Sequence, residues 1–153
     1  MGFWNFLFGK TVKVDDAFFG EMIVIEISNN PVESYFECER YFKPSGEKIA
    51  LGVTGSVSGP TQRQKDFFMQ IENDYSLLIA KFALVIETRL GAWTAVPVTK
   101  EFEAEFKPTY FSIPTCDQQP IAWEIAFDTV HDVNHTVTVG TLGYEPYYVR
   151  IDG

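Results

Sequence analysis

The chain has 153 residues, enough for one domain to bury a hydrophobic core without disulfides or metal ions. Hydrophobic residues make up 46% of the sequence and charged residues 22%, which excludes an intrinsically disordered chain. The formal net charge of -9 argues against nucleic acid and anionic membrane surfaces as partners, because their phosphate groups would be repelled.

A hydrophobic segment opens the chain at residues 1–9. Its aromatic residues are Phe3, Trp4, Phe6 and Phe8. Rings in that number would form an aggregation-prone patch if water surrounded them. We therefore expect the segment to dock onto the domain or onto another copy of it, and a homo-oligomer is compatible with the sequence.

Three strands are predicted before residue 60. Residues 18–28 contain a nearly continuous β-branched run, which is typical of a buried strand. Residues 35–42 and 49–57 alternate between apolar and polar positions, with Glu37 and Glu39 on the polar face of the first. The turns between them are short and rich in Asn, Pro and Gly, which indicates an antiparallel meander.

The clearest element is an amphipathic helix of about residues 61–90. Thr61 and Gln64 have the spacing of a capping box, and Gly91 is the predicted end of the helix. Nine apolar residues share one face: Phe67, Phe68, Ile71, Tyr75, Leu78, Ile79, Phe82, Val85 and Ile86. No polar group interrupts this stripe, so we interpret it as core that packs on a sheet and not as a cofactor site.

Residues 92–97 are predicted to be irregular, and residues 99–106 are ambiguous. Alternation of phenylalanine and glutamate in the second segment suits a strand, whereas the i,i+4 spacing of Phe102 and Phe106 suits a short helix, which we favour. Further strands are expected at 110–113, 123–128, 136–139 and 147–151. The prediction is a single α+β domain spanning 1–153, with an antiparallel sheet of about six or seven strands and the long helix across one face.

Both histidines of the chain lie in one segment, together with an aspartate. His131, Asp132 and His135 are ligand types for zinc or iron. The segment 129–134 is predicted to be a turn between strands, however, and no third protein ligand is apparent nearby. We therefore predict no metal or other cofactor, and keep a small metal-dependent enzyme built on these three residues as the alternative function.

Glutamates recur in two places that could carry a partner or acid–base chemistry. Glu37 and Glu39 share a predicted strand face, and Glu101, Glu103 and Glu105 recur in one short segment. Catalysis would need carboxylates that face each other across a cleft, which the sequence does not reveal. A folded surface that gathers these five residues would attract a basic protein, such as a nuclease toxin.

The remaining signals favour a non-catalytic protein of the cytoplasm. Cys38 and Cys116 are too few for a disulfide scaffold and carry no nucleophile signature. Phosphate-binding loops, dinucleotide fingerprints and serine-hydrolase motifs are absent from the sequence. No apolar run approaches the roughly 20 residues of a membrane-spanning helix, and no secretion signal opens the chain.

Three stretches carry a resemblance to known bacterial proteins. They read DDAFFGE at 15–21, TQRQKDFF at 61–68, and WEIAFD at 123–128 followed by HTVTV at 135–139. Their order is similar to that of several bacterial families of uncharacterised domains, some of whose members look like immunity proteins of toxin systems. The resemblance implies a bacterial protein-binding domain and supplies no catalytic residues.

Overall fold

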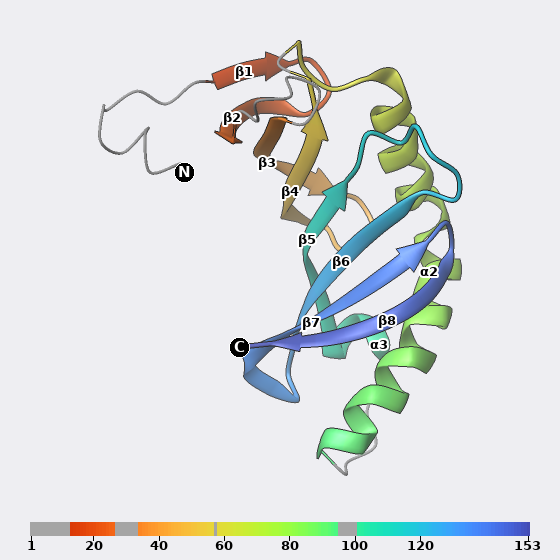
Figure 1. The fold of residues 1–153 in the computed structure, drawn as a ribbon. Helices are drawn as coiled ribbons and strands as arrows, with labels where there is room; N and C mark the ends of the chain where they lie inside the picture. The colour runs from red at the N-terminus through yellow and green to blue at the C-terminus, as the bar shows by residue number, and fades with distance from the viewer. Residues whose placement is uncertain (1–12, 27–33, 57, 95–100) are drawn as a thin grey trace.

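A computed structural model describes residues 13–26, 34–56, 58–94 and 101–153, and the segment 1–9 discussed above lies outside these ranges. One sheet of eight strands carries the long helix α2 on one face (Figure 1). The strands are β1 (Lys13–Asp16), β2 (Gly20–Glu26), β3 (Ser34–Phe42), β4 (Glu47–Gly55), β5 (Phe106–Ile113), β6 (Ala122–Thr129), β7 (Asp132–Leu142) and β8 (Glu145–Asp152). The helices are α2 (Gln62–Thr94) and the short α3 (Phe102–Glu105).

The strands lie in the sheet in the order of the sequence. Neighbouring strands are antiparallel except β4 and β5, which run parallel with Ala50 beside Tyr110. Parallel neighbours need a crossover of a dozen or more residues, and α2 provides it. The predicted α+β class with one helix across a sheet is confirmed, but the sheet has eight strands instead of six or seven. The strand that was missed is β1, whose sequence KVDD has no hydrophobic pattern to reveal it.

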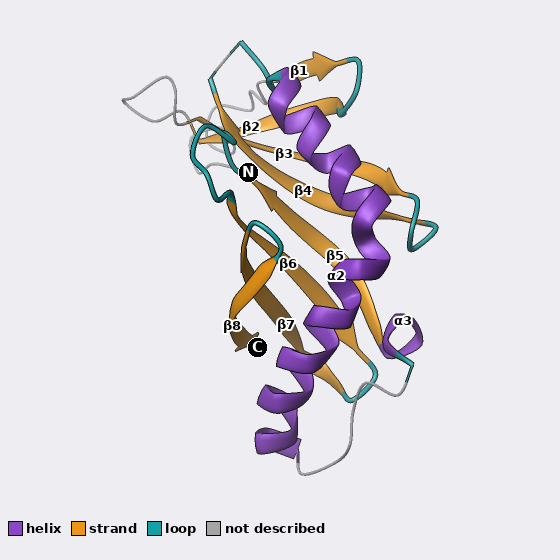
Figure 2. Ribbon diagram, turned by 90° about the vertical axis from the view of Figure 1, so that its right-hand side faces the viewer, coloured by secondary structure: helices purple, strands orange, loops and turns teal. Residues whose placement is uncertain are grey.

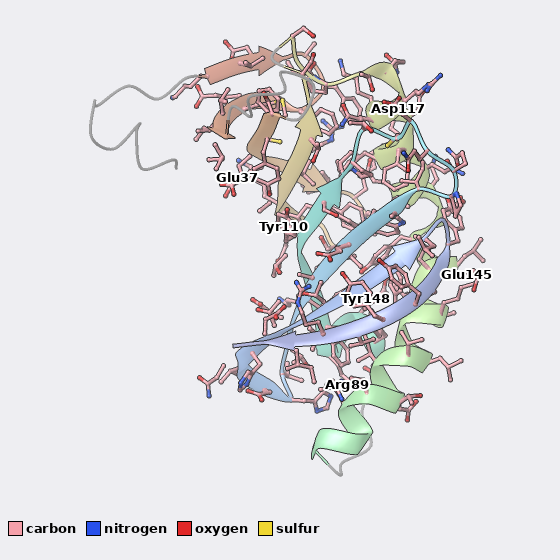
Figure 3. The ribbon with its side chains drawn as sticks, in the orientation of Figure 1. Glu37, Arg89, Tyr110, Asp117, Glu145 and Tyr148 are labelled. Atoms are coloured by element: carbon pink, nitrogen blue, oxygen red, sulfur yellow. The ribbon has the colours of Figure 1, made fainter. Side chains whose placement is uncertain are left out.

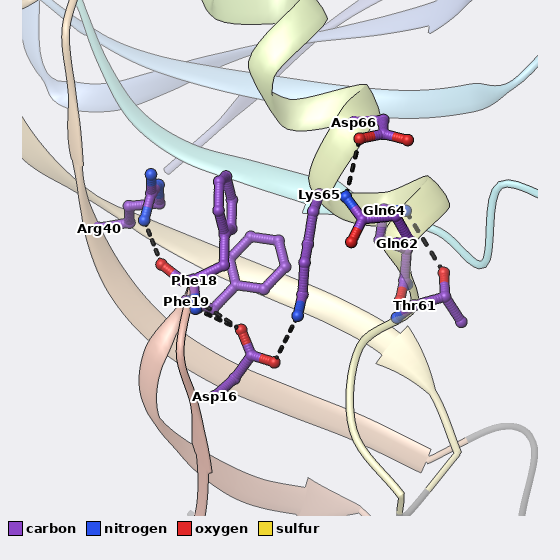
Figure 4. Close-up of polar contacts among 9 residues, drawn as sticks. All are labelled: Asp16, Phe18, Phe19, Arg40, Thr61, Gln62, Gln64, Lys65 and Asp66. Atoms are coloured by element: carbon purple, nitrogen blue, oxygen red, sulfur yellow. Dashed lines mark hydrogen bonds and ion pairs between the residues drawn. The ribbon is translucent and has the colours of Figure 1, made fainter.

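The start of α2 has the predicted capping box. The Gln64 Oε1 atom accepts a hydrogen bond from the Thr61 backbone N–H at 2.9 Å, and Thr61 Oγ1 accepts one from the Gln64 N–H at 3.3 Å (Figure 4). The next residue, Lys65, forms an ion pair of 2.9 Å with Asp16 of β1. The first turn of the helix is thus joined to the edge of the sheet.

The apolar stripe of α2 faces the sheet, as predicted, and α2 runs diagonally across it (Figure 2). Leu78, Phe82 and Ile86 are completely buried, and the Phe82 ring packs edge-on against Trp123 and Phe127 of β6. The predicted end at Gly91 is wrong, because a glycine ends a helix by adopting a left-handed conformation and Gly91 remains helical. No helix in the described part of the chain is long and apolar enough to cross a membrane.

Two boundaries in the second half of the chain differ from their predictions. The ambiguous segment contains the short helix α3, as favoured, but Phe106 already begins β5, four residues before the predicted strand. Phe102 and Phe106 are both buried, and their rings stack with centroids 5.0 Å apart. Two buried residues at i,i+4 spacing resemble the apolar face of a helix, although only Phe102 lies in α3. The strand β7 begins at Asp132, so residues 132–134 lie on a strand and not in the predicted turn.

Candidate functional site

Within the described ranges, no helix covers the face of the sheet opposite α2, and this open face carries polar residues of the central strands. On it, Asp15 of β1 is aligned with Glu21 of β2, and Ile23 of β2 with Glu37 of β3. The same register brings Glu21 beside Glu39. Glu37 and Tyr110 both project from this face, away from α2 (Figure 3). Carboxylates of three neighbouring strands therefore lie together at one end of the open face.

A depression of about 530 Å³ is sunk into this end of the sheet. We call it the acidic depression and define it by six of its lining residues: Glu21, Glu37, Glu39, Lys48, Ala50 and Tyr110. Ala50 forms its floor, because β4 places this small side chain between Glu39 of β3 and Tyr110 of β5. Small residues on a central strand with larger neighbours on both sides produce a hollow of this shape.

The wall on the β5 side is fixed by a pair of tyrosines. The hydroxyl groups of Tyr35 and Tyr110 lie 2.7 Å apart and meet above Gly52, where the Cβ of any other residue would overlap both of them. Burial and the hydrogen bond with Tyr35 raise the pKa of Tyr110 above its usual value of 10.0. The Tyr110 phenol therefore stays neutral near pH 7, and the wall offers ring faces and hydroxyl groups to a ligand.

A third tyrosine lies over a second glycine further along the same face. Tyr148 of β8 lies over Gly140 of β7 and donates a hydrogen bond to the Glu124 carboxylate of β6. Arg150 approaches Glu124 at 3.7 Å and forms a closer ion pair with Asp152 at 2.7 Å. Here one cation, Arg150, contacts both carboxylates, Glu124 and Asp152.

The acidic depression has fewer cations than carboxylates. Among its six defining residues, three are glutamates and one is a lysine, and Glu21 has a further partner in Lys13 at 2.9 Å. Like charges beside each other on neighbouring strands destabilise a sheet. Glu37 and Glu39 are exposed to solvent. The arrangement is thus able to accept hydrogen bonds from ammonium or guanidinium groups of a ligand, which would relieve this repulsion.

The three residues predicted as alternative metal ligands form two separate pairs. The His131 Nε2 atom lies 2.8 Å from Glu105 of α3, while the His135 Nδ1 atom lies 2.8 Å from Asp132. Asp132 and His135 are three residues apart in β7, and the hydrogen bond from His135 lowers the pKa of the Asp132 carboxyl. Within the ranges described, no group of three or more His, Cys, Asp or Glu side chains is arranged to hold a metal ion.

The five glutamates predicted to bind a partner are divided between the two sides of the sheet. Glu37 and Glu39 lie on the open face, in the acidic depression. Glu101, Glu103 and Glu105 lie in or beside α3, whose Phe102 belongs to the core between the sheet and α2. The Glu105 carboxylate already forms a hydrogen bond with His131. Only the first two therefore share a surface with Glu21.

Neither cysteine is placed as a nucleophile. Burial raises the pKa of Cys38 to about 12 and the pKa of Cys116 to about 11, so both thiols are protonated near pH 7. The Cys116 thiol donates a hydrogen bond to the Pro114 carbonyl oxygen at 3.3 Å. Cys38 is a small buried residue of the core, as its strand pattern predicted.

The chain matches no protein-family model, no curated protein sequence and no solved structure.

Sequence reasoning missed Glu21, Tyr35 and Tyr110 as parts of the site. Tyr35 and Tyr110 are 75 positions apart, and they meet only because β4 separates β3 from β5. The available signal was the alternation of side chains along a strand. Tyr35, Glu37 and Glu39 alternate with the buried Phe36 and Cys38, so the sequence indicated that these three residues share a face.

Proposed function

We propose that this chain is a non-catalytic protein-binding domain that holds a basic partner in the acidic depression. The observation that supports it most is the meeting of Glu21, Glu37 and Glu39 around the small side chain of Ala50. An arginine or lysine of the partner would fill the hollow above Ala50. Its charge would be stabilised by carboxylates that now repel one another.

The tyrosine wall adds a second element of recognition. A guanidinium group above the floor would lie near the Tyr110 ring, and arginine stacks on aromatic rings while its N–H groups bind carboxylates. Because Tyr110 is held by Tyr35, its ring is ordered before a partner arrives, which lowers the entropic cost of binding. Arginine is therefore favoured over lysine at this position.

The similarity to bacterial domains that look like immunity proteins makes a basic toxin the first class of partner to test. An immunity protein binds its toxin and blocks it, and a nuclease toxin is basic because it binds phosphates. Long-range attraction between such a toxin and a chain of net charge -9 would speed their encounter.

The test compares two double variants with the same change in net charge. Glu37→Gln with Glu39→Gln removes two carboxylates from the acidic depression, and Glu101→Gln with Glu103→Gln removes two exposed ones from the α3 side. The probes are the purified basic proteins encoded beside the gene, with binding rates measured at low and physiological ionic strength. We expect the first pair to slow association about tenfold or more and the second to have little effect.

Two outcomes would contradict the proposal. Equal losses in both double variants would assign the effect to net charge and not to the acidic depression. Tight binding that does not weaken with added salt would show that the carboxylates are not what the partner recognises.

A further inference from the structure

A small pocket of about 160 Å³ lies where α2, α3, the start of β5 and the turn between β3 and β4 meet. Figure 2 shows this turn and α3 on the same side of α2. The lining residues form a buried floor, a half-buried wall and an exposed rim: Tyr75, Phe106 and Pro108, then Pro44 and Ser45, then Glu47, Glu103 and Lys107. We call it the tyrosine pocket. None of these described residues also lines the acidic depression.

The Tyr75 hydroxyl group forms no hydrogen bond within the described ranges, although the residue is only 4% exposed. The unpaired side-chain atoms that are sealed from water in these ranges belong to Ser34, Arg40 and Thr141. The Tyr75 hydroxyl is not one of them, so it reaches solvent, and the tyrosine pocket is the opening through which it does so. A group that both donates and accepts hydrogen bonds therefore points into the pocket with both capacities unused.

The half-buried tyrosines of the described ranges differ from Tyr75, because their hydroxyl groups all have partners. The contacts join Tyr35 to Tyr110, Tyr144 to the Asp74 carboxylate, and Tyr148 to the Glu124 carboxylate. Buried tyrosine hydroxyl groups generally find such a partner. Tyr75 is more deeply buried than these residues and lacks one, so a bound molecule would supply the missing contact.

The rim of the tyrosine pocket carries more negative than positive charge. Glu47 forms an ion pair of 3.5 Å with Lys107, which leaves the Glu103 carboxylate without a cation among the described residues. Burial and then the charge of Glu103 raise the pKa of Tyr75 above its usual value of 10.0. The hydroxyl group therefore stays protonated near pH 7, beside a carboxylate whose charge is not neutralised.

We propose that the tyrosine pocket binds a small primary alkylammonium compound. The ammonium group would donate hydrogen bonds to the Tyr75 hydroxyl oxygen and the Glu103 carboxylate, because a cation enters a buried site only where acceptors and an opposite charge receive it. The alkyl chain would lie against Phe106 and Pro108. The volume is sufficient, since a cavity of about 150 Å³ holds a molecule as large as benzene.

Ligands of other charge or shape match the tyrosine pocket less well. An anion would be repelled by Glu103, and the one cation among the lining residues, Lys107, is already paired with Glu47. A quaternary ammonium ion carries the right charge but has no N–H group to donate to Tyr75. A primary ammonium group satisfies both the unpaired hydroxyl and the unpaired carboxylate.

A nuclear magnetic resonance titration tests the proposal, with n-butylammonium chloride as the probe and sodium chloride at equal concentration as the reference. We expect saturable shifts of the backbone amide signals of residues 45–47 and 103–107, with a dissociation constant of about 1 mM. Sodium butyrate has a similar chain and the opposite charge, and tetramethylammonium chloride has the same charge without N–H groups. Both should bind at least about tenfold more weakly.

Two single variants assign the binding to its residues. Tyr75→Phe removes the hydroxyl group and keeps the ring that packs against Phe42, and Glu103→Gln removes the charge. Each should raise the dissociation constant of n-butylammonium about tenfold. The matched controls are Tyr147→Phe, on the exposed part of β8, and Glu101→Gln, which is exposed and does not line the pocket, and both should bind like the unmodified chain.

The titration also separates this site from the acidic depression, whose carboxylates attract cations as well. Shifts confined to the residues of the acidic depression would overturn the proposal for the tyrosine pocket and leave the proposed function standing. Equal binding of butyrate, no saturable shift up to about 50 mM, or an unchanged affinity in Tyr75→Phe and Glu103→Gln would overturn it too.

Discussion

The side-chain amide of Gln64 donates a hydrogen bond to the Pro114 carbonyl oxygen at 2.8 Å. The same nitrogen donates to the Thr54 carbonyl oxygen at 2.6 Å, while the amide oxygen caps the helix at Thr61. Thr54 belongs to β4 and Pro114 directly follows β5, so one buried side chain ties the helix start to both strands of the parallel pair. The residue predicted to complete a local cap is therefore also a tertiary link.

Replacing Gln64 should destabilise the fold more than a capping residue usually does. In Gln64→Ala the two carbonyl oxygens lose their donor and the Thr61 N–H loses its acceptor, so we expect a loss of about 2–3 kcal/mol in the free energy of unfolding. Urea denaturation measures it. The control is Gln62→Ala, which removes only an exposed hydrogen bond to Asp66 and should cost less than about 0.5 kcal/mol. A loss of only about 1 kcal/mol for Gln64→Ala would mean that Gln64 acts through the cap alone.

Phe82 should be one of the most costly positions on α2 to truncate. Its ring is completely buried against Trp123 and Phe127, so Phe82→Ala removes apolar contact and leaves a cavity. We expect a loss of about 3–5 kcal/mol in the free energy of unfolding. Leu84→Ala, on the exposed side of the helix, should change it by less than about 0.5 kcal/mol. A loss below about 1 kcal/mol for Phe82→Ala would show that this side of α2 is not the core.

Asp16 should make stability depend on acidic pH. Burial raises the pKa of its carboxyl, but the Lys65 ammonium and the N–H groups of Phe19 and Phe18 outweigh burial and lower it below 3.8 (Figure 4). A carboxyl whose pKa is lowered on folding stabilises the folded state fully at pH values above its pKa in the unfolded chain, about 3.9. This contribution is lost as the pH falls through the pKa of the carboxyl in the folded protein.

The variant Asp16→Asn tests this dependence. At pH 7 it should lose about 1–3 kcal/mol of stability, since hydrogen bonds to a charged group and an ion pair are weakened. The difference from the unmodified chain should shrink as pH is lowered below about 4 and the native carboxyl becomes protonated. Denaturation curves at several pH values give the comparison. A difference that is constant with pH would show that the charge of Asp16 does not contribute.

Two glycines should respond to alanine in opposite directions. A Cβ at Gly140 would overlap the Tyr148 ring, so Gly140→Ala should displace that ring and cost about 1–3 kcal/mol of stability. A Cβ at Gly91 meets no atom within 4 Å, and alanine is the better helix former, so Gly91→Ala should raise stability by about 0.5–1 kcal/mol. Thermal melting of both variants, compared with the unmodified chain, measures these two changes in stability. A stabilised Gly140→Ala variant would mean that Tyr148 does not rest on Gly140.

The sequence by itself determined the elements whose signals are local. The capping box at Thr61 and Gln64, the buried stripe of α2 and the alternation of β3 were readable because their interactions span a few residues. The end of α2 could not be predicted from the sequence, since Gly91 is equally compatible with ending and with continuing a helix. The short strand β1 could not be predicted either, because its pairing with β2 stabilises a segment that lacks a hydrophobic pattern of its own.

Only the tertiary structure decided which surfaces form. The crossover through α2 places β4 beside β5, which brings Tyr110 to Tyr35 and completes the acidic depression. The same topology sends Glu101, Glu103 and Glu105 to the other side of the sheet from Glu37 and Glu39, because α3 packs with the core through Phe102. The alternation of side chains along a strand predicts which residues share a face of that strand. The order and direction of the strands depend on contacts between distant segments, which no local pattern encodes.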